Sequence, residues 1–144
     1  MILTRVGPIF WLVVHLTAVA VLAGVGWVVQ LVVYPAFRLV GADAWARYHQ
    51  AHTRAITRVV GVPWLVQGVS TAALLLSFDD RRVAAVLAVL ALITVVSTVL
   101  SAVPAHGRLA PAPDPADITL LLRANLVRTL AWSASTVLAA AILV

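Results

Sequence analysis

The chain consists largely of four long apolar segments joined by short polar connections, and this alternation restricts it to very few folds. The segments run from about Pro8 to Tyr34, Arg54 to Phe78, Val83 to Val103 and Ile118 to Val144. Each is long enough to cross a hydrocarbon core of roughly 30 Å as a helix. Lipid offers no partner to an unpaired backbone group, so such spans must be helical. The sequence therefore predicts an all-α bundle of four transmembrane helices, in a single domain covering residues 1–144.

Composition supports an integral membrane protein and excludes several other classes. Of the 144 residues, 63% are hydrophobic and 10% are charged, with a mean hydropathy of +1.07, whereas soluble domains carry about 25% charged residues. The chain has no cysteine, which excludes disulfides and thiolate ligands. All basic residues are arginines scattered around the apolar segments, so no nucleic-acid partner is expected. The expected partners are the lipid bilayer and a lipophilic small molecule.

The connections carry signals for helix starts and ends. The stretch Gly41–Thr53 is polar with aromatic residues, which predicts a short interfacial helix between helices one and two, capped by Asp43. Pro35 and Pro104 are expected to end segments one and three, because proline cannot continue the helical hydrogen-bond pattern. Asp117 is expected to cap segment four.

Four crossings bring three of the four histidines to one face of the membrane. His49 and His52 precede segment two and lie three residues apart, so they share one helix face. His106 follows segment three. Imidazoles are the commonest metal ligands, so these three histidines are candidate ligands for a transition metal, copper or iron, or for haem. The alternative is that they only contact lipid headgroups or anchor hydrogen bonds.

The arginines are distributed unequally between the two faces. Seven fall on the histidine face and three on the other, which predicts that the histidine face is cytoplasmic. The seven are Arg38, Arg47, Arg54, Arg58, Arg108, Arg123 and Arg128, and the three are Arg5, Arg81 and Arg82.

Segment four carries a polar stripe near the histidine face. Asn125, Arg128 and Trp132 follow i, i+3, i+7 spacing, and an arginine at this depth either snorkels to the surface or faces a polar interior. We therefore expect a polar cavity in which His106, Asn125 and Arg128 are the catalytic residues. The alternative is that these groups only hydrogen-bond the helices together. The expected substrate-binding residues are Gln30, Tyr34, Tyr48, Arg108 and Trp132.

His15 belongs to a second layer, nearer the opposite face. It lies about 22 Å along the helix axis from Gln30. The hydroxyl groups expected to meet it belong to Ser70, Thr71, Ser135 and Thr136. The favoured interpretation is a buried histidine hydrogen-bonded to a hydroxyl, and the alternatives are a second ligand site or a proton relay.

Four motifs resemble a family of uncharacterised bacterial four-helix membrane proteins. They are VQLVVYPAF (Val29–Phe37), YHQAHTRAITRVVGVP (Tyr48–Pro63), PAHGRLA (Pro104–Ala110) and RANLVRTLAW (Arg123–Trp132). The last two also resemble, more distantly, the family that includes anthrone oxygenases. That resemblance implies oxidation of an aromatic or quinone-like substrate, with His106, Asn125 and Arg128 at the matching positions. The position of Gln67 is often acidic in the closer group, so a neutral glutamine weakens any metal or proton role there.

Two functional hypotheses follow. The first is a membrane-embedded, oxygenase-like oxidoreductase acting on a lipophilic aromatic or quinone-like substrate. Arg128 and Asn125 would stabilise a developing oxyanion, and a histidine would act as general base if no metal is bound. The second is a non-enzymatic membrane protein, either a small-solute carrier or an accessory or assembly subunit. Four helices are few for a carrier, so that version requires a homo-oligomer. All five acidic residues lie in loops or at helix ends, which excludes a paired-carboxylate mechanism.

Overall fold

The computed structural model describes Leu3–Val144, with side chains from Gly7 onward, and every regular element in it is helical. The predicted side-chain placement of Arg5 therefore lies outside the described residues. The elements are α1 (Leu3–Val28), the π-helix η1 (Val29–Val33), α2 (Tyr34–Ala36), the 3₁₀ turn η2 (Phe37–Leu39), α3 (Ala42–Ser77), α4 (Arg81–Ser97), the π-helix η3 (Thr98–Ala102), α5 (Val103–Leu109) and α6 (Pro115–Leu143).

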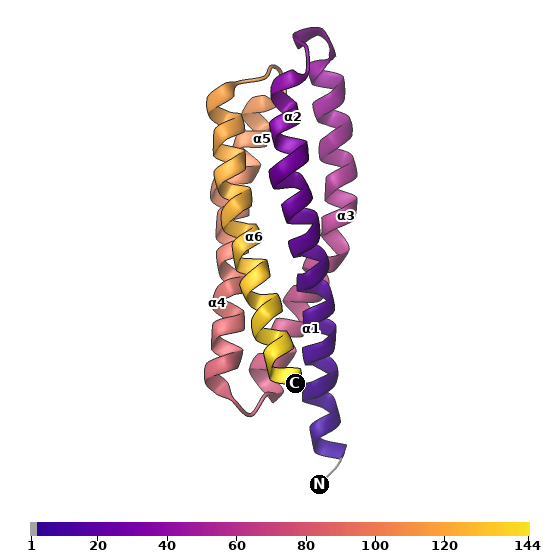
Figure 1. Ribbon diagram of the computed structural model, residues 1–144, viewed down its shortest axis with the longest axis vertical. Coiled ribbons are helices and arrows are strands. Elements are labelled where there is room, and N and C mark those ends of the chain that lie inside the picture. Colours follow the sequence, from indigo (N-terminus) through magenta and orange to yellow (C-terminus); the bar gives the residue numbers. More distant parts are fainter. Residues whose placement is uncertain (1–2) are drawn as a thin grey trace.

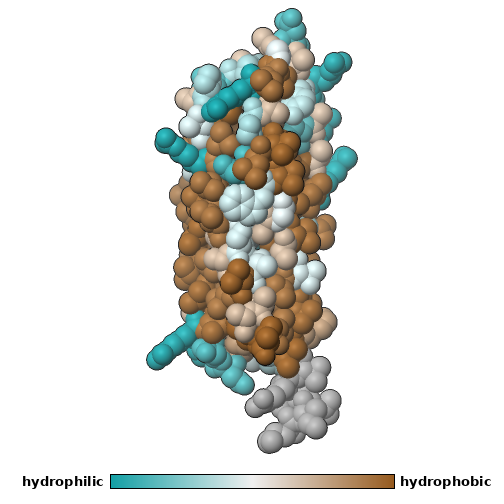
Figure 2. Space-filling view, viewed as in Figure 1, coloured by the Kyte–Doolittle hydropathy of each residue, from teal (hydrophilic) through white to brown (hydrophobic). Residues whose placement is uncertain are grey.

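These elements join into four long antiparallel rods that lie side by side (Figure 1). Each rod is long and apolar enough to cross a membrane, with mean hydropathies of 1.6 to 2.8 in its most apolar stretch. On the face shown in Figure 2, hydrophobic residues cover most of the middle of the bundle and the most hydrophilic residues lie toward its two ends. The predicted all-α, four-helix architecture is confirmed. We call the end formed by α2, the start of α3, α5 and the start of α6 the histidine end.

The two prolines expected to end helices do not end them. In each case a five-residue π-helix finishes two residues before the proline: η1 precedes Pro35 and η3 precedes Pro104. A proline has no N–H and clashes with the carbonyl four residues earlier. The wider π turn accommodates this defect without stopping the rod. Both rods consequently continue to Leu39 and Leu109, and each π-helix leads directly into a residue of the site described below.

The separate interfacial helix predicted before segment two is not confirmed. Residues 42–77 form one uninterrupted helix, α3, which at 1.5 Å per residue is about 54 Å long. Its N-cap is Gly41 rather than Asp43, which lies inside the first turn and makes no capping hydrogen bond. The aromatic residues of this stretch therefore extend α3 beyond its apolar part, and they pack on η2 through Phe37 and Trp45.

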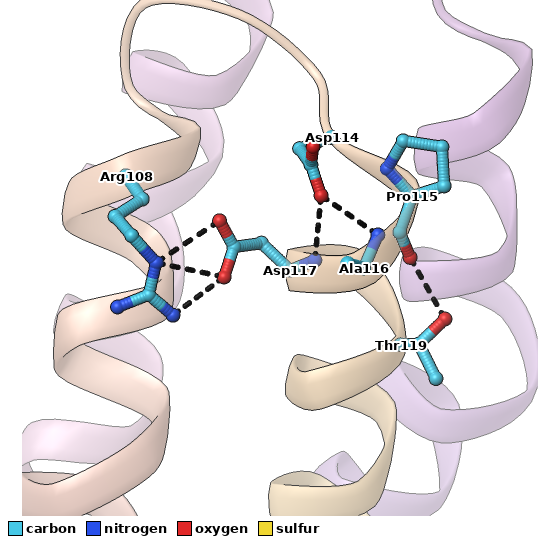
Figure 3. A network of polar contacts seen from close by, with 6 residues as sticks. All are labelled: Arg108, Asp114, Pro115, Ala116, Asp117 and Thr119. Carbon is cyan, nitrogen blue, oxygen red and sulfur yellow. Dashed lines mark hydrogen bonds and ion pairs between the residues drawn. The ribbon is translucent and has the colours of Figure 1, made fainter.

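The cap of α6 also differs from the prediction. The carboxylate of Asp114 accepts hydrogen bonds from the backbone N–H groups of Ala116 and Asp117, at 2.7 and 3.0 Å (Figure 3). Pro115 occupies the first helical position, where its missing N–H costs nothing. Asp117 is instead free to pair with Arg108 across the loop, with a shortest N–O distance of 2.5 Å. The cap of α6 therefore lies at Asp114, three residues before the predicted Asp117, because proline favours the first helical position.

The core packing places α1 against both α3 and α6. The helices α1 and α6 approach closely at Gly26, where an added Cβ would lie 2.5 Å from Oγ1 of Thr129. This approach brings the last turns of α1 beside the polar stripe of α6. Near the opposite end, Leu12, Leu74, Leu87 and Ala139 form a separate apolar cluster from all four rods.

Candidate functional site

A cavity of about 300 Å³ lies between η1–α2, the middle of α3, η3–α5 and α6. Its volume is at the lower end of the range for small-molecule sites. Aliphatic residues and glycines form most of its wall, and among the described residues no carboxylate lines it. Its polar and aromatic lining residues are Tyr34, Thr57, Trp64, Thr98, His106, Asn125, Arg128 and Trp132.

The guanidinium of Arg128 is held on the cavity wall by neutral partners. One terminal nitrogen donates to Oγ1 of Thr98 at 3.1 Å, and the other donates to Oδ1 of Asn125 at 3.3 Å. The amide nitrogen of Asn125 donates to the carbonyl of Gly26 and to Oε1 of Gln30. The buried Nε of Arg128 has no hydrogen-bond partner among the described residues. This fixed cation therefore faces an apolar space with donor capacity unused.

The histidines meet in a short row beside the same cavity. Nε2 of His106 lies 3.1 Å from the hydroxyl of Tyr34, and Nδ1 of His106 lies 3.1 Å from Nε2 of His49. The ring of His52 is close to parallel with that of His106, with centroids 6.1 Å apart. Buried Trp45 stacks on His49 and Phe37 packs edge-on against His52. The predicted gathering of the three histidines is thus present, and Tyr34 joins it.

The arrangement of the described residues does not support the predicted metal centre. Among the described residues, no group of three or more His, Cys, Asp or Glu side chains is arranged to hold a metal ion. The ring nitrogens of His49 and His106 point at each other rather than at a common point, and the second nitrogen of His106 faces a phenol. Nε2 of His52 is buried without a partner and contacts neither of the other two rings by hydrogen bonding. The ring of His52 instead packs edge-on against Phe37, with centroids 5.0 Å apart.

The remaining predicted site residues divide between the cavity and the end surface. Trp132 lines the cavity and donates from its indole nitrogen to Oε1 of Gln67 at 3.0 Å. Gln30 touches the site only through Asn125. Arg108 and Tyr48 do not reach the cavity: Arg108 pairs with Asp117 on the end surface (Figure 3), and half-exposed Tyr48 packs on Phe37.

Sequence reasoning missed three polar or aromatic cavity residues, which are Thr57, Trp64 and Thr98. Thr98 anchors Arg128, and Trp64 forms part of the wall while donating to Oγ1 of Thr94. Thr98 is one of four hydroxyl residues in its apolar segment, so the sequence gives no sign that this one faces the cavity. Trp64 follows Pro63 in the middle of α3 and gives no sign of the direction it faces.

His15 occupies a second, fully buried polar layer, as predicted. Its Nε2 lies 2.9 Å from Oγ of Ser135, and its Nδ1 lies 3.2 Å from Oγ of Ser70 and 3.4 Å from Oγ1 of Thr71. Thr136 instead donates to a carbonyl of its own helix. All ring nitrogens of His15 are therefore satisfied by hydroxyls, which confirms the interpretation as a hydrogen-bonded buried histidine.

Comparisons of the chain with protein-family models, with curated proteins and with solved structures find no match. The resemblance stated from the sequence motifs therefore stays a prediction, and the function is argued from the site itself.

Proposed function

We propose that the chain is an integral membrane protein that spans the bilayer four times. Large aliphatic side chains stand exposed along the bundle, among them Leu31, Leu65 and Leu100, each at least 68% exposed. Water would penalise such a surface, whereas lipid would not. The surplus of arginines at the histidine end supports a cytoplasmic placement of that end, in a bacterial inner membrane.

We further propose that the cavity binds a lipophilic aromatic or quinone-like compound through an acidic oxygen. The observation that carries this proposal is Arg128, whose guanidinium faces an apolar cavity without a carboxylate partner and keeps one buried N–H unused. A cation in such a place is costly unless an anion joins it. A phenolate or enolate oxygen would supply that anion, and the apolar wall would accommodate the ring system.

The proposed reaction is an oxygenase-like oxidation that begins with loss of a proton. Tyr34 and His106 line the same cavity as the guanidinium and provide the acid–base groups. A preorganised cation beside the forming oxyanion lowers the barrier to deprotonation. The resulting anion is electron-rich and reacts with dioxygen. An activated methylene plus dioxygen gives a ketone plus water, so the overall step needs no external reductant.

The test measures binding and turnover separately on purified protein in lipid nanodiscs. 2-Naphthol serves as the binding probe, because its neutral and ionised forms absorb at different wavelengths. Arg128→Gln should weaken binding of the ionised form by roughly 10- to 100-fold, since a charge-assisted hydrogen bond is lost. Arg123→Gln is the matched control, because Arg123 lies on the same helix but outside the cavity.

Anthrone with an oxygen electrode then tests the reaction class. Oxygen consumption with ketone formation, lost in Arg128→Gln and kept in Arg123→Gln, would support the oxidoreductase. Binding of 2-naphthol without any anthrone turnover would instead favour the non-enzymatic carrier or accessory role. If wild-type protein binds no probe, the proposal that this cavity is a ligand site is wrong.

A further inference from the structure

The row formed by Tyr34, His106 and His49 connects two different environments. Tyr34 and His106 line the mostly apolar cavity, whereas His49 and His106 line a more open depression at the histidine end together with Arg47, Gln50 and Gly107. We call this second hollow the outer depression. The three side chains come from α2, α5 and α3, so no single helix imposes their alignment.

We infer that Tyr34, His106 and His49 form a proton relay that carries the substrate proton from the cavity to the outer depression. This inference rests on the proposed function, because it needs a substrate that loses a proton in the cavity. Two consecutive contacts of 3.1 Å make the row continuous. That distance is within the usual range for a hydrogen bond that can transmit a proton.

Imidazole suits this role because it can accept a proton at one ring nitrogen while releasing another from the second. His106 uses both nitrogens within the row, one toward Tyr34 and one toward His49. The row can therefore exist in two polarities. In one, Tyr34 donates to His106 and His106 donates to His49. In the other, His49 donates to His106 and His106 donates to the oxygen of Tyr34.

Transfer changes one polarity into the other. The acidic bond to hydrogen in the substrate breaks as the oxygen of Tyr34 takes up that proton, while the original hydroxyl proton passes to Nε2 of His106. The Nδ1 proton of His106 moves to Nε2 of His49, and Nδ1 of His49 releases its proton to water in the outer depression. Every relay side chain keeps the same number of protons, and the substrate remains as an anion beside Arg128.

The same row can reset during the proposed reaction. Addition of dioxygen to the substrate carbanion gives a peroxide anion, which takes up one proton before water is lost. If that proton returns along the row, each hydrogen bond regains its original direction. No charged relay group has to persist in the apolar cavity at any stage, which is the physical advantage of a neutral tyrosine–imidazole row.

His52 provides an internal control, because it lies beside the relay without belonging to it. Its ring is 6.1 Å from those of Tyr34 and His106, centroid to centroid, yet its buried Nε2 makes no hydrogen bond. A substitution there changes the same neighbourhood and removes one imidazole. It leaves both 3.1 Å contacts in place.

The experiment follows proton transfer by stopped flow, mixing protein in nanodiscs with 2-naphthol. Absorbance reports ionisation of the probe, and a membrane-impermeant pH indicator reports proton release. His49→Gln can still hold a hydrogen bond to His106 but cannot hand a proton onward. It should leave the equilibrium affinity for the probe near wild type while slowing both signals by roughly 10- to 100-fold. His52→Phe should keep the wild-type rates.

Chemical rescue separates a relay from a structural role. In His49→Ala the lost ring leaves space that opens to the outer depression, so imidazole added to the buffer should restore the rate in proportion to its concentration. Imidazole should not restore the rate of Tyr34→Phe, whose defect lies at the cavity. Thermal unfolding followed by circular dichroism shows which variants are folded.

The outcomes distinguish the relay from the function on which it rests. Slow transfer in His49→Gln, normal transfer in His52→Phe and rescue by imidazole together support the relay. Wild-type rates in a folded His49→Gln would overturn the relay and leave the binding site intact. A wild-type protein that binds 2-naphthol without ionising it would remove the deprotonation step and the relay with it.

Discussion

Replacing Gly26 with alanine should destabilise the bundle, whereas the same replacement at Gly24, two residues earlier in α1, should not. A Cβ at Gly26 would lie 2.5, 3.2 and 3.3 Å from Oγ1, Cβ and Cγ2 of Thr129, whereas a Cβ at Gly24 meets nothing within 4 Å. Thr129 is fully buried, so its side chain cannot swing into solvent. The backbones of α1 and α6 would have to separate.

The magnitude follows from comparing the two variants. Alanine is favoured over glycine in a helix by about 1 kcal/mol at either position, so this contribution cancels in the difference. Overpacking a tight contact costs typically about 1–3 kcal/mol. We therefore expect Gly26→Ala to have a free energy of unfolding lower than that of Gly24→Ala by about 1–3 kcal/mol. Separation of the helices should also weaken the hydrogen bond from Asn125 to the Gly26 carbonyl.

The assay is reversible unfolding in mixed micelles, with increasing denaturing detergent and circular dichroism as the signal. The double variant Gly26→Ala/Thr129→Ala provides a cycle, because removing the threonine hydroxyl and methyl makes room for the new Cβ. The double variant should recover part of the lost stability. Equal stability of the two glycine variants, or no recovery in the double variant, would refute the reasoning.

Two further predictions concern individual hydrogen bonds. Ser135→Ala should lower the free energy of unfolding by about 1–3 kcal/mol, because Nε2 of His15 loses its one hydroxyl partner. Ser70→Ala should lower it by less, because a second hydroxyl lies 3.4 Å from Nδ1 of His15. Detergent unfolding of both variants checks this order. Asp114→Ala should cost about 0.5–2 kcal/mol through loss of the α6 cap. Asp117→Ala should cost less than Asp114→Ala, because its partner Arg108 is half exposed to solvent, which weakens the ion pair. The reverse order in thermal unfolding would contradict the assignment of the cap.

The sequence predicted that the polar residues of the candidate site lie near one end of the bundle, but not how they contact one another. The spacing of Asn125, Arg128 and Trp132 indicated one stripe on one helix, and the topology indicated that His106 and His49 share an end. Neither observation gives the rotation of each rod about its own axis. That rotation decides that Arg128 enters the cavity.

Local competition explains the predictions that were wrong about helix ends. Pro35 and Pro104 read as stop signals, but a π turn before each absorbs the missing hydrogen bond and lets the rod continue. Asp117 read as a cap, but Asp114 captures the free N–H groups first because Pro115 begins the helix. The sequence offers several possible start and end residues within a few positions, and packing at the end of the bundle decides which of them is used.

The sequence by itself determined four apolar helices, the absence of acidic groups from their middles and the gathering of histidines at one end. Those properties follow from chain length, from hydropathy and from the face of the membrane that each connection reaches after successive crossings. None of these needs tertiary information. Only the tertiary structure decided that His49 contacts His106 and that His106 contacts the Tyr34 hydroxyl. The reason is that hydrogen-bond direction depends on ring orientation, and ring orientation is set by Phe37 and Trp45 packed around them.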